Sequence, residues 1–302
     1  MARPYAPAQP APSEDPLFAR IYHLPYRQRR GEFSRRVVTG YPRFLYRYGS
    51  LNADNIDRAR DLIVRSELWL SSPTDFNDPF DTAAHVVFDG TINEMRAWLM
   101  KREAAVVGLD PAEKARRREA MLANPTQLAA TVPATFRKHL DAAGIACFTP
   151  DPRNLLMWSH YGASHKGIAY QFEPTQALDT FTYAVPVNYS EEYPVVDWLR
   201  DPQSGLRSTM LRKHPGWAYE RESRIFQPNG GRSYLPFDPS GLTGIILGCK
   251  ASAETETALQ RLLEERTAAG RPAVKLYRAQ MHPQAYKVTL SAMLIASLSQ
   301  HG

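Results

Sequence analysis

The chain has 302 residues, of which 43% are apolar, 11% aromatic and 23% charged, values typical of a globular protein long enough to bury a sizeable core. Its formal charge of +6, from 37 Lys and Arg against 31 Asp and Glu, favours anionic partners such as nucleotides or nucleic acid without demanding them. No apolar run approaches the ~18 residues that a membrane span requires, so we expect no membrane partner and a cytoplasmic location.

The first 42 residues are predicted to form an N-terminal extension, partly disordered and rich in arginine. The opening MARPYAPAQPAPSEDP is dominated by Pro and Ala and cannot bury an apolar face. A contact with nucleic-acid phosphates is one interpretation of the arginine cluster that follows, but a solvated arm is the favoured one. The cluster consists of Arg27, Arg29, Arg30, Arg35 and Arg36.

Residues 43–302 are predicted to form a single α+β domain. Short strand-like runs such as FLYRY, LWL, GIACFT, GIAYQFE and GIILGC alternate with helical stretches, which indicates a twisted, mainly antiparallel mixed sheet with flanking helices. A helical insertion is expected at about 91–143, and its cationic stretch KARRREA is interpreted as a solvated helix face. Cys147 and Cys249 lie in apolar, strand-like runs and are predicted to be buried free thiols.

The segment SSPTDFNDPFD is predicted to form a rigid turn. Asp78 precedes a proline and is therefore pushed towards extended geometry, while Asn77 can bond to its own backbone. A divalent metal would accept the carboxylates of Asp75, Asp78 and Asp81, but the spacing matches no calcium loop and no histidine is adjacent, so we predict no metal. The supporting turn consists of Asp75, Phe76, Asn77, Asp78 and Pro79.

The segment NLLMWSHYGASHKG is interpreted as a helix that ends at Gly167. Trp158, Tyr161 and His165 then recur on one stripe, and His165 with Lys166 in the last turn complements the helix dipole. Tyr161 beside His160 makes a platform for stacking a flat heterocycle, although core packing is an equal alternative.

The segment WAYERESRIF is interpreted as a strand. Its period of two places Glu220, Glu222 and Arg224 on one face, and two neighbouring carboxylates need a cation between them, supplied by Arg224 or by a substrate. In FLYRYGS, Arg47 lies between Tyr46 and Tyr48 on a half-buried sheet, so it needs an anionic partner. We expect Glu222 or a bound phosphate to be that partner.

Taken together, LYRYGS, LWLSSPTDFNDPFD, CFT with LLMWSHYGASHKGIAYQF, and WAYERESRIF resemble a bacterial family of proteins of unknown function, the domain-of-unknown-function 2971 family. The resemblance covers roughly residues 43–248. It leaves out the N-terminal extension and much of the helical block, and it implies kinship without an activity.

A more remote resemblance is to the ADP-ribosyltransferases, which have a split, strongly twisted sheet and cleave NAD. This resemblance implies that Glu222, with Glu220, stabilises the oxocarbenium character of the breaking nicotinamide–ribose bond. It implies NAD as the substrate, with a nucleic acid or a protein as the acceptor and a role as an effector or defence toxin. The first strand here carries Arg rather than His, which departs from one branch of that family. The implied NAD-binding residues are Arg47, Tyr46, Tyr161, His160 and Trp158.

Two other functions stay open at this point. One is a metal-dependent phosphodiesterase or nuclease, in which Asp75, Asp78, Asp81 and Glu222 bind a divalent ion and His160 or Lys166 contacts phosphate. The other is a non-enzymatic nucleotide-binding sensor. A chelator would inactivate the first and leave an ADP-ribosyltransferase unaffected, whereas a sensor would show no turnover.

Overall fold

The computed structural model describes residues 31, 41–104 and 106–293. The predicted arginine cluster and nearly all of the N-terminal extension lie outside these residues, so the structure does not test them. None of the described helices is long and apolar enough to cross a membrane.

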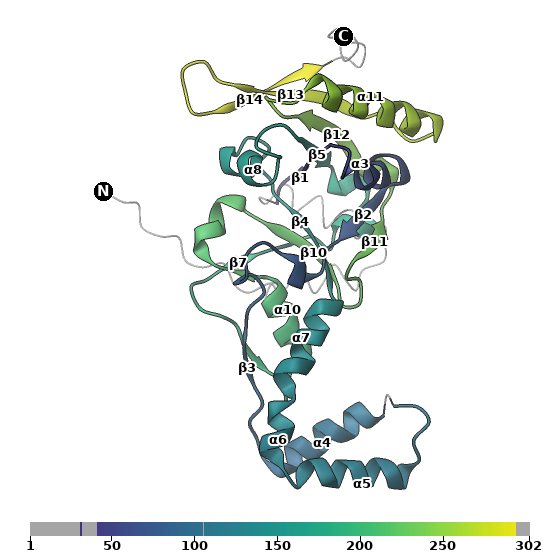
Figure 1. The fold of residues 1–302 in the computed structure, drawn as a ribbon, viewed down its shortest axis with the longest axis vertical. Coiled ribbons are helices and arrows are strands. Elements are labelled where there is room, and N and C mark those ends of the chain that lie inside the picture. Colours follow the sequence, from purple (N-terminus) through teal and green to yellow (C-terminus); the bar gives the residue numbers. More distant parts are fainter. Residues whose placement is uncertain (1–30, 32–40, 105, 294–302) are drawn as a thin grey trace, which may run out of the picture.

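The upper part of the molecule in Figure 1 is built on a five-stranded sheet with the order β1-β5-β12-β13-β14. All neighbours pair antiparallel except β12 and β13, which run parallel and are joined by the crossover helix α11, Ala253–Ala268. The prediction of a mainly antiparallel mixed sheet with flanking helices is therefore confirmed. The strands are β1 Leu45–Gly49, β5 Ile168–Phe172, β12 Leu242–Leu247, β13 Lys275–Met281 and β14 Val288–Met293.

The core of this part lies between the sheet and the helical layer. Leu259 and Leu262 of α11 pack with Ile63, which belongs to a π-helical turn (Asp61–Arg65) that continues helix α3, Ile56–Arg60. All three side chains are almost completely buried. The amphipathic helix predicted near the C-terminus thus contributes its apolar face to the core.

A second, three-stranded sheet with the order β4-β10-β6 lies below the first (Figure 1). The two sheets meet at one bridge, in which Tyr46 of β1 and Thr149, directly after β4, exchange backbone hydrogen bonds of 2.7 and 2.9 Å. The strand pair β2–β11 adjoins β4 through a bridge from Ser71 to Ile145. These strands are β4 Gly144–Phe148, β10 Ser223–Gln227, β6 Val185–Pro186, β2 Glu67–Leu70 and β11 Ser233–Pro236.

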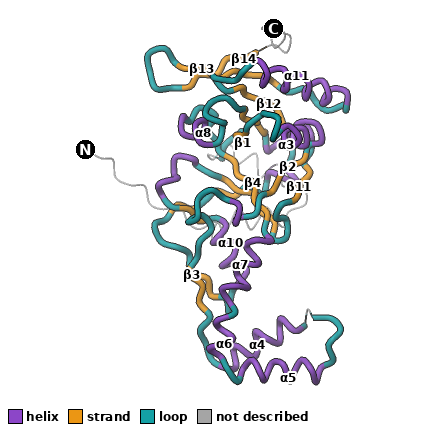
Figure 2. The backbone as a smooth tube through the Cα atoms, viewed as in Figure 1, coloured by secondary structure: helices purple, strands orange, loops and turns teal. Residues whose placement is uncertain are grey.

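Residues 91–143 form four helices, and three of them make up the foot of the molecule in Figures 1 and 2, away from the five-stranded sheet. A small core in the foot includes Met95, Leu99, Leu122 and Leu128, and Leu199 from the segment before α10 also belongs to it. The fourth helix, α7, leads back to β4. The helices are α4 Ile92–Glu103, α5 Pro111–Leu122, α6 Pro125–Ala130 and α7 Val132–Ala142.

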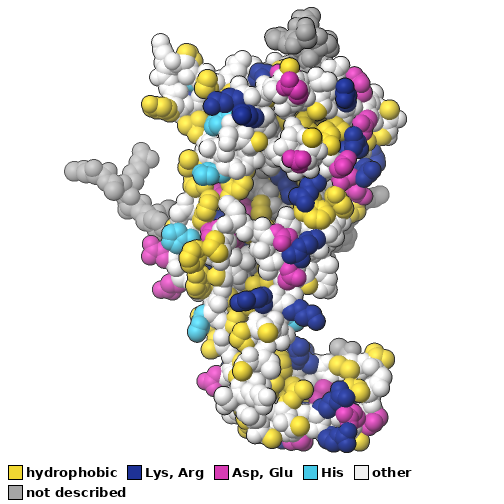
Figure 3. All heavy atoms as spheres, viewed as in Figure 1, with side chains coloured by type: hydrophobic (Ala, Val, Ile, Leu, Met, Phe, Trp, Pro, Cys, Tyr) yellow, Lys and Arg dark blue, Asp and Glu magenta, His cyan; other side chains and the backbone are white. Residues whose placement is uncertain are grey.

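The stretch KARRREA lies on α5, where its arginines pair with glutamates. Arg117 Nε donates to Glu113 at 2.7 Å, and Arg118 Nη1 donates to Glu103 of α4 at 2.6 Å. Basic and acidic side chains are interspersed over the foot in Figure 3. This mixture is typical of a solvated helix face and offers no continuous basic patch on the face in view.

Several short elements complete the fold around the two sheets. Strand β3 pairs with β8 and β7 pairs with β9, in parallel in both cases. The elements are α8 Leu155–His160, α9 Leu178–Phe181, α10 Pro202–Met210, β3 His85–Val87, β7 Asn188–Tyr189, β8 Val195–Asp197 and β9 Arg212–Lys213, with 3-10 turns at Pro73–Asp75, Pro174–Gln176, Pro215–Glu220 and Pro239–Gly241.

Candidate functional site

A cavity of about 210 Å³ lies where the two sheets diverge from the bridge between Tyr46 and Thr149. Its walls come from β1, the turn after β2, β4, α8 and the segment that precedes and begins β10. Asn77, an exposed residue, lies at its rim. The lining residues are Tyr46, Arg47, Tyr48, Phe76, Asn77, Asp81, Cys147, Phe148, Thr149, Met157, Tyr161, Lys213, Glu220, Glu222 and Arg224.

Arg224, whose side chain is fully buried, organises the charges on one wall of this cavity. Its Nη1 and Nη2 donate to the two carboxylate oxygens of Asp81 at 2.9 and 2.6 Å. Its Nε and Nη2 donate to the two oxygens of Glu222 at 2.8 and 3.0 Å. Such fork-shaped pairs fix the geometry of both carboxylates. Arg224 is thus the cation that joins the FNDPFD turn to the start of β10.

Lys213 of β9 supplies the second cation. Its Nζ donates to Glu220 Oε2 at 2.7 Å and to Glu222 Oε2 at 3.2 Å, and it lies 3.5 Å from Asp81 Oδ2. On the opposite side of Glu220, the hydroxyl of Tyr161 donates to Oε1 at 2.8 Å. Both oxygens of Glu220 therefore have a partner, as buried polar groups require.

The two glutamates have pKa values that are shifted in opposite directions. Burial raises the pKa of Glu220 above its ordinary value, and the contact with Lys213 only partly offsets this. Burial also acts to raise the pKa of Glu222, but the charges of Arg224 and Lys213 outweigh it and lower that pKa to about 2. Two neighbouring carboxylates with separated pKa values are a common arrangement in acid–base catalysis.

Arg47 has no carboxylate partner among the described residues. Its Nη1 donates to the backbone oxygen of Trp69 at 3.1 Å, and burial lowers its pKa. The predicted pairing with Glu222 is wrong, because both oxygens of that glutamate are already engaged by Arg224. Arg47 thus lines the cavity with a positive charge that no acidic side chain in the described part of the chain neutralises.

The cavity brings together residues from all four of the segments singled out in the sequence. Arg47, Tyr161 and Glu222, expected to act together, all line it. The prediction from the sequence missed Lys213. The signal that could have found it is its position, seven residues before Glu220, together with the expectation that two buried carboxylates need more than one cation. The predicted residues that line the cavity are Tyr46, Arg47, Phe76, Asn77, Tyr161, Glu220 and Glu222.

Other predicted residues lie elsewhere. Trp158 is fully buried, with its ring edge-on to Tyr48 at 4.9 Å between centroids. His160 is exposed and lies near the rings of Trp217 and Tyr219 rather than in the cavity. Trp158 therefore supports the cavity wall from behind, and His160 lies outside it.

The predicted helix that ends at Gly167 is too long, because α8 ends at His160. A Cβ atom at Gly162 would lie 2.6 Å from the ring of Trp158, so the chain passes too close for any other residue. Ala163, Ser164 and His165 then have positive φ angles of 49°, 54° and 68°, which no α-helix contains.

The predicted strand over WAYERESRIF is correct only in its second half. Residues Pro215–Glu220 form a 3-10 turn, and Arg221 is left-handed with a φ of 48°. The turn begins where His214 Nδ1 accepts a hydrogen bond from the backbone of Gly216 and where proline occupies the first position, a favourable start for a helix. Glu220 and Glu222 therefore meet through a turn and not through strand alternation.

The four carboxylates expected for a metal-dependent phosphodiesterase do not share one site. Asp75 is an exposed residue paired with Arg232 at 2.8 Å, and Asp78 accepts a hydrogen bond from the backbone of Phe80 at 2.9 Å. Only Asp81 and Glu222 approach each other, and Arg224 lies between them. Within the described ranges, no group of three or more His, Cys, Asp or Glu side chains could hold a metal ion.

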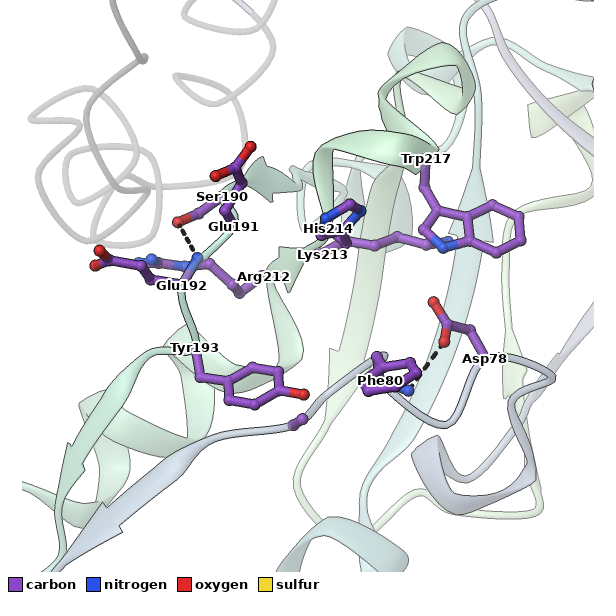
Figure 4. Close-up of a pocket in the computed structure, with 11 residues that line it drawn as sticks. Asp78, Phe80, Ser190, Glu191, Glu192, Tyr193, Arg212, Lys213, His214 and Trp217 are labelled. Atoms are coloured by element: carbon purple, nitrogen blue, oxygen red, sulfur yellow. Dashed lines mark hydrogen bonds between the residues drawn. The ribbon is translucent and has the colours of Figure 1, made fainter.

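A neighbouring cavity of about 410 Å³ shares Lys213 with the first one. Figure 4 shows the rings of Phe80, Tyr193 and Trp217 around it, with Lys213 and His214 along one wall. Lys213 Nζ lies 4.9 Å from the centre of the Trp217 ring. Arg212 also lines this cavity, and its Nε is buried without a hydrogen-bond partner in the described part of the protein.

Comparison with known proteins supports the first resemblance over part of the chain. Residues 157–225 match a family model described as a protein of unknown function (DUF2971). The matched segment runs from α8 into β10 and contains six of the cavity residues: Met157, Tyr161, Lys213, Glu220, Glu222 and Arg224. Searches of the curated proteins and of the solved structures found no match.

Proposed function

We propose that the 210 Å³ cavity binds the nicotinamide end of NAD and that the protein transfers ADP-ribose to an acceptor. One observation carries the proposal: three carboxylates, those of Asp81, Glu220 and Glu222, share two cations, Lys213 and Arg224. With all five groups ionised, this cluster keeps one negative charge. A positively charged nicotinamide ring, or a ribose that gains positive charge as its bond breaks, complements that charge.

The pKa values assign different tasks to the two glutamates. Glu222, whose pKa is lowered to about 2, is ionised at neutral pH and stabilises the oxocarbenium ion electrostatically while nicotinamide leaves with the electrons of the broken bond. Glu220, whose pKa is raised, is closer to the range in which a general base works, so it takes the proton of the acceptor as the acceptor attacks C1′ of the ribose.

Other groups that line the cavity match the rest of the ligand. Arg47 offers its charge to the pyrophosphate, and the rings of Tyr161 and Phe76 give the nicotinamide flat surfaces. The cavity is smaller than the ~300–1,000 Å³ of a drug-sized ligand site, so it suits one end of a dinucleotide. The neighbouring cavity, with Arg212 and three aromatic rings, takes the other end.

The test is release of nicotinamide from NAD by the purified full-length protein, with DNA, RNA or cell lysate as the source of acceptor. We expect release that a chelator does not affect and that Glu222→Gln abolishes. Glu265→Gln, which removes a carboxylate paired with Arg60 outside the cavity, is the matched control and should leave release unchanged.

Two outcomes would refute the proposal. Binding of NAD without release in the presence of every acceptor would identify a non-enzymatic sensor. If calorimetry detected no NAD binding to wild-type protein, and cooperative unfolding showed that this protein was folded, NAD would be excluded as the ligand.

A further inference from the structure

A third cavity, of about 620 Å³, lies between the chain around α8 and the loop that joins β13 to β14. It shares no lining residue with the two cavities described above. That loop projects beyond α8 in Figure 1. The ionisable side chains that line it are His165, Cys249, Lys250, His282, Tyr286 and Lys287, and none of its lining residues is an Asp or Glu. The cavity is therefore an electropositive site that contains a thiol.

The thiol of Cys249 has a histidine as its neighbour. Its Sγ lies 3.8 Å from Nδ1 of His165, within reach of a hydrogen bond to sulfur. The imidazole lies nearly parallel to the Trp158 ring, with 6.4 Å between the ring centroids and an angle of 16° between the planes. Both His165 and Cys249 are half-buried, so the pair remains accessible.

The backbone fixes this pair in place. His165 is the last of three consecutive residues with positive φ, a conformation that costs free energy for residues other than glycine. Two hydrogen bonds join this loop to the chain after β12, from Gly248 N to Gly167 O at 2.8 Å and from Lys250 N to His165 O at 2.9 Å. A Cβ atom at Gly248 would lie 2.2 Å from His165 O, so glycine is required for this approach.

His165 can act as the proton acceptor for the Cys249 thiol, 3.8 Å away. Burial and the charge of Lys250 lower the pKa of His165, so its imidazole is neutral at pH 7 and can accept a proton at Nδ1. Cys147 has no such site, because burial and the nearby Glu222 raise its pKa well above the ordinary value.

We propose that Cys249 and His165 form a reactive thiol site that takes an anionic, low-molecular-weight disulfide. The thiol proton passes to His165 Nδ1, and the thiolate attacks one sulfur of the disulfide. The disulfide bond of the ligand breaks, a mixed disulfide forms at Cys249, and the released thiolate takes up the proton from His165. Lys250 and Lys287 bind the carboxylates of the ligand. This site is independent of the NAD chemistry proposed above.

The experiment compares two disulfide reagents on the full-length protein: dithiobis-nitrobenzoate, which is anionic, and dithiodipyridine, which is neutral. We expect Cys249 to react with the anionic reagent about tenfold faster in the folded protein than in the unfolded chain in denaturant, with the adduct located by peptide mass mapping. Cys249→Ser should remove this fast phase, and Cys147→Ser should retain it.

Two further variants separate the parts of the site. His165→Asn, in which asparagine tolerates the left-handed backbone but cannot take the proton, should slow both reagents about tenfold. The double variant Lys250→Gln, Lys287→Gln changes two exposed side chains and should slow only the anionic reagent. The proposal is overturned if Cys249 in the folded protein reacts no faster than in the unfolded chain, or if the lysine variant slows both reagents equally.

Discussion

Asp81 and Arg224 lie 143 positions apart in the sequence, yet both carboxylate oxygens of Asp81 accept hydrogen bonds from the guanidinium of Arg224. The side chains are 3% and 0% exposed, so the pair is removed from water. This contact ties the FNDPFD turn to β10 and explains why a surface-like, acidic segment has a fixed position beside the core.

Arg224→Met should therefore destabilise the protein strongly. The variant leaves Asp81 and Glu222 buried beside each other with one cation fewer, and breaking a buried pair in this way costs about 3–5 kcal/mol. Urea denaturation measures the change in the free energy of unfolding. Arg232→Met, which breaks exposed pairs with Asp75 and Asp141, is the control and should shift the midpoint little. Equal shifts for both variants would contradict the assigned role of Arg224.

Arg47→Met should have little effect on stability or increase it, because no acidic group among the described residues compensates the charge that burial disfavours. The same change should weaken binding of ADP-ribose by at least about tenfold, since a charge-assisted contact to phosphate is lost. Thermal unfolding and calorimetric titration with ADP-ribose measure the two effects separately. A large loss of stability would show that Arg47 is structural.

Stability should depend on pH through Glu222. Its pKa falls from an ordinary 4.5 to about 2 on folding, so its contribution is fully present above about pH 4.5 and is lost as the pH falls towards 2. The difference in the free energy of unfolding between wild type and Glu222→Gln should shrink over this interval. A difference that stays constant from pH 6 to pH 3 would mean that Glu222 is not ionised in the folded protein.

Tyr161→Phe removes the hydroxyl that donates to Glu220 at 2.8 Å. The cost should be about 0.5–1.5 kcal/mol, the usual contribution of one hydrogen bond. With its donor lost, Glu220 should become protonated at a higher pH, which would move the acidic limb of the pH–rate profile to higher pH, because a general base must be deprotonated. Tyr219→Phe, on a half-buried ring with no described hydrogen bond from its hydroxyl, is the matched control. Identical profiles for the two variants would contradict the role of Tyr161.

The sequence predicts the class of fold well because strand-like runs and amphipathic helices are local patterns. The resemblance to ADP-ribosyltransferases also led to Arg47, Tyr161 and Glu222, which line one cavity although Arg47 and Glu222 are not paired. Lys213 could not be found in this way. It lies on β9, a strand of two residues, and its partners become neighbours only through tertiary folding.

Two errors in the local structure have a common origin. The helix predicted through His165 and the strand predicted through Trp217 both cross residues with positive φ: the run that ends at His165 in one case and Arg221 in the other. Non-glycine residues take this conformation only when the surrounding structure compensates the cost. A prediction from periodicity alone therefore extends a helix or strand beyond the residue at which it ends in the folded protein.

The order of the cavity walls along the chain has a consequence for biosynthesis. The first wall, β1 with Arg47, leaves the ribosome long before Glu222 and Arg224 are synthesised, and the four helices of residues 91–143 are made in between. The small core of the foot includes Leu199, so it is complete only after that residue has been made. The wall that carries Glu222 and Arg224 cannot form before β10 has been made. A nascent chain therefore has no complete cavity until about three quarters of its length has been translated.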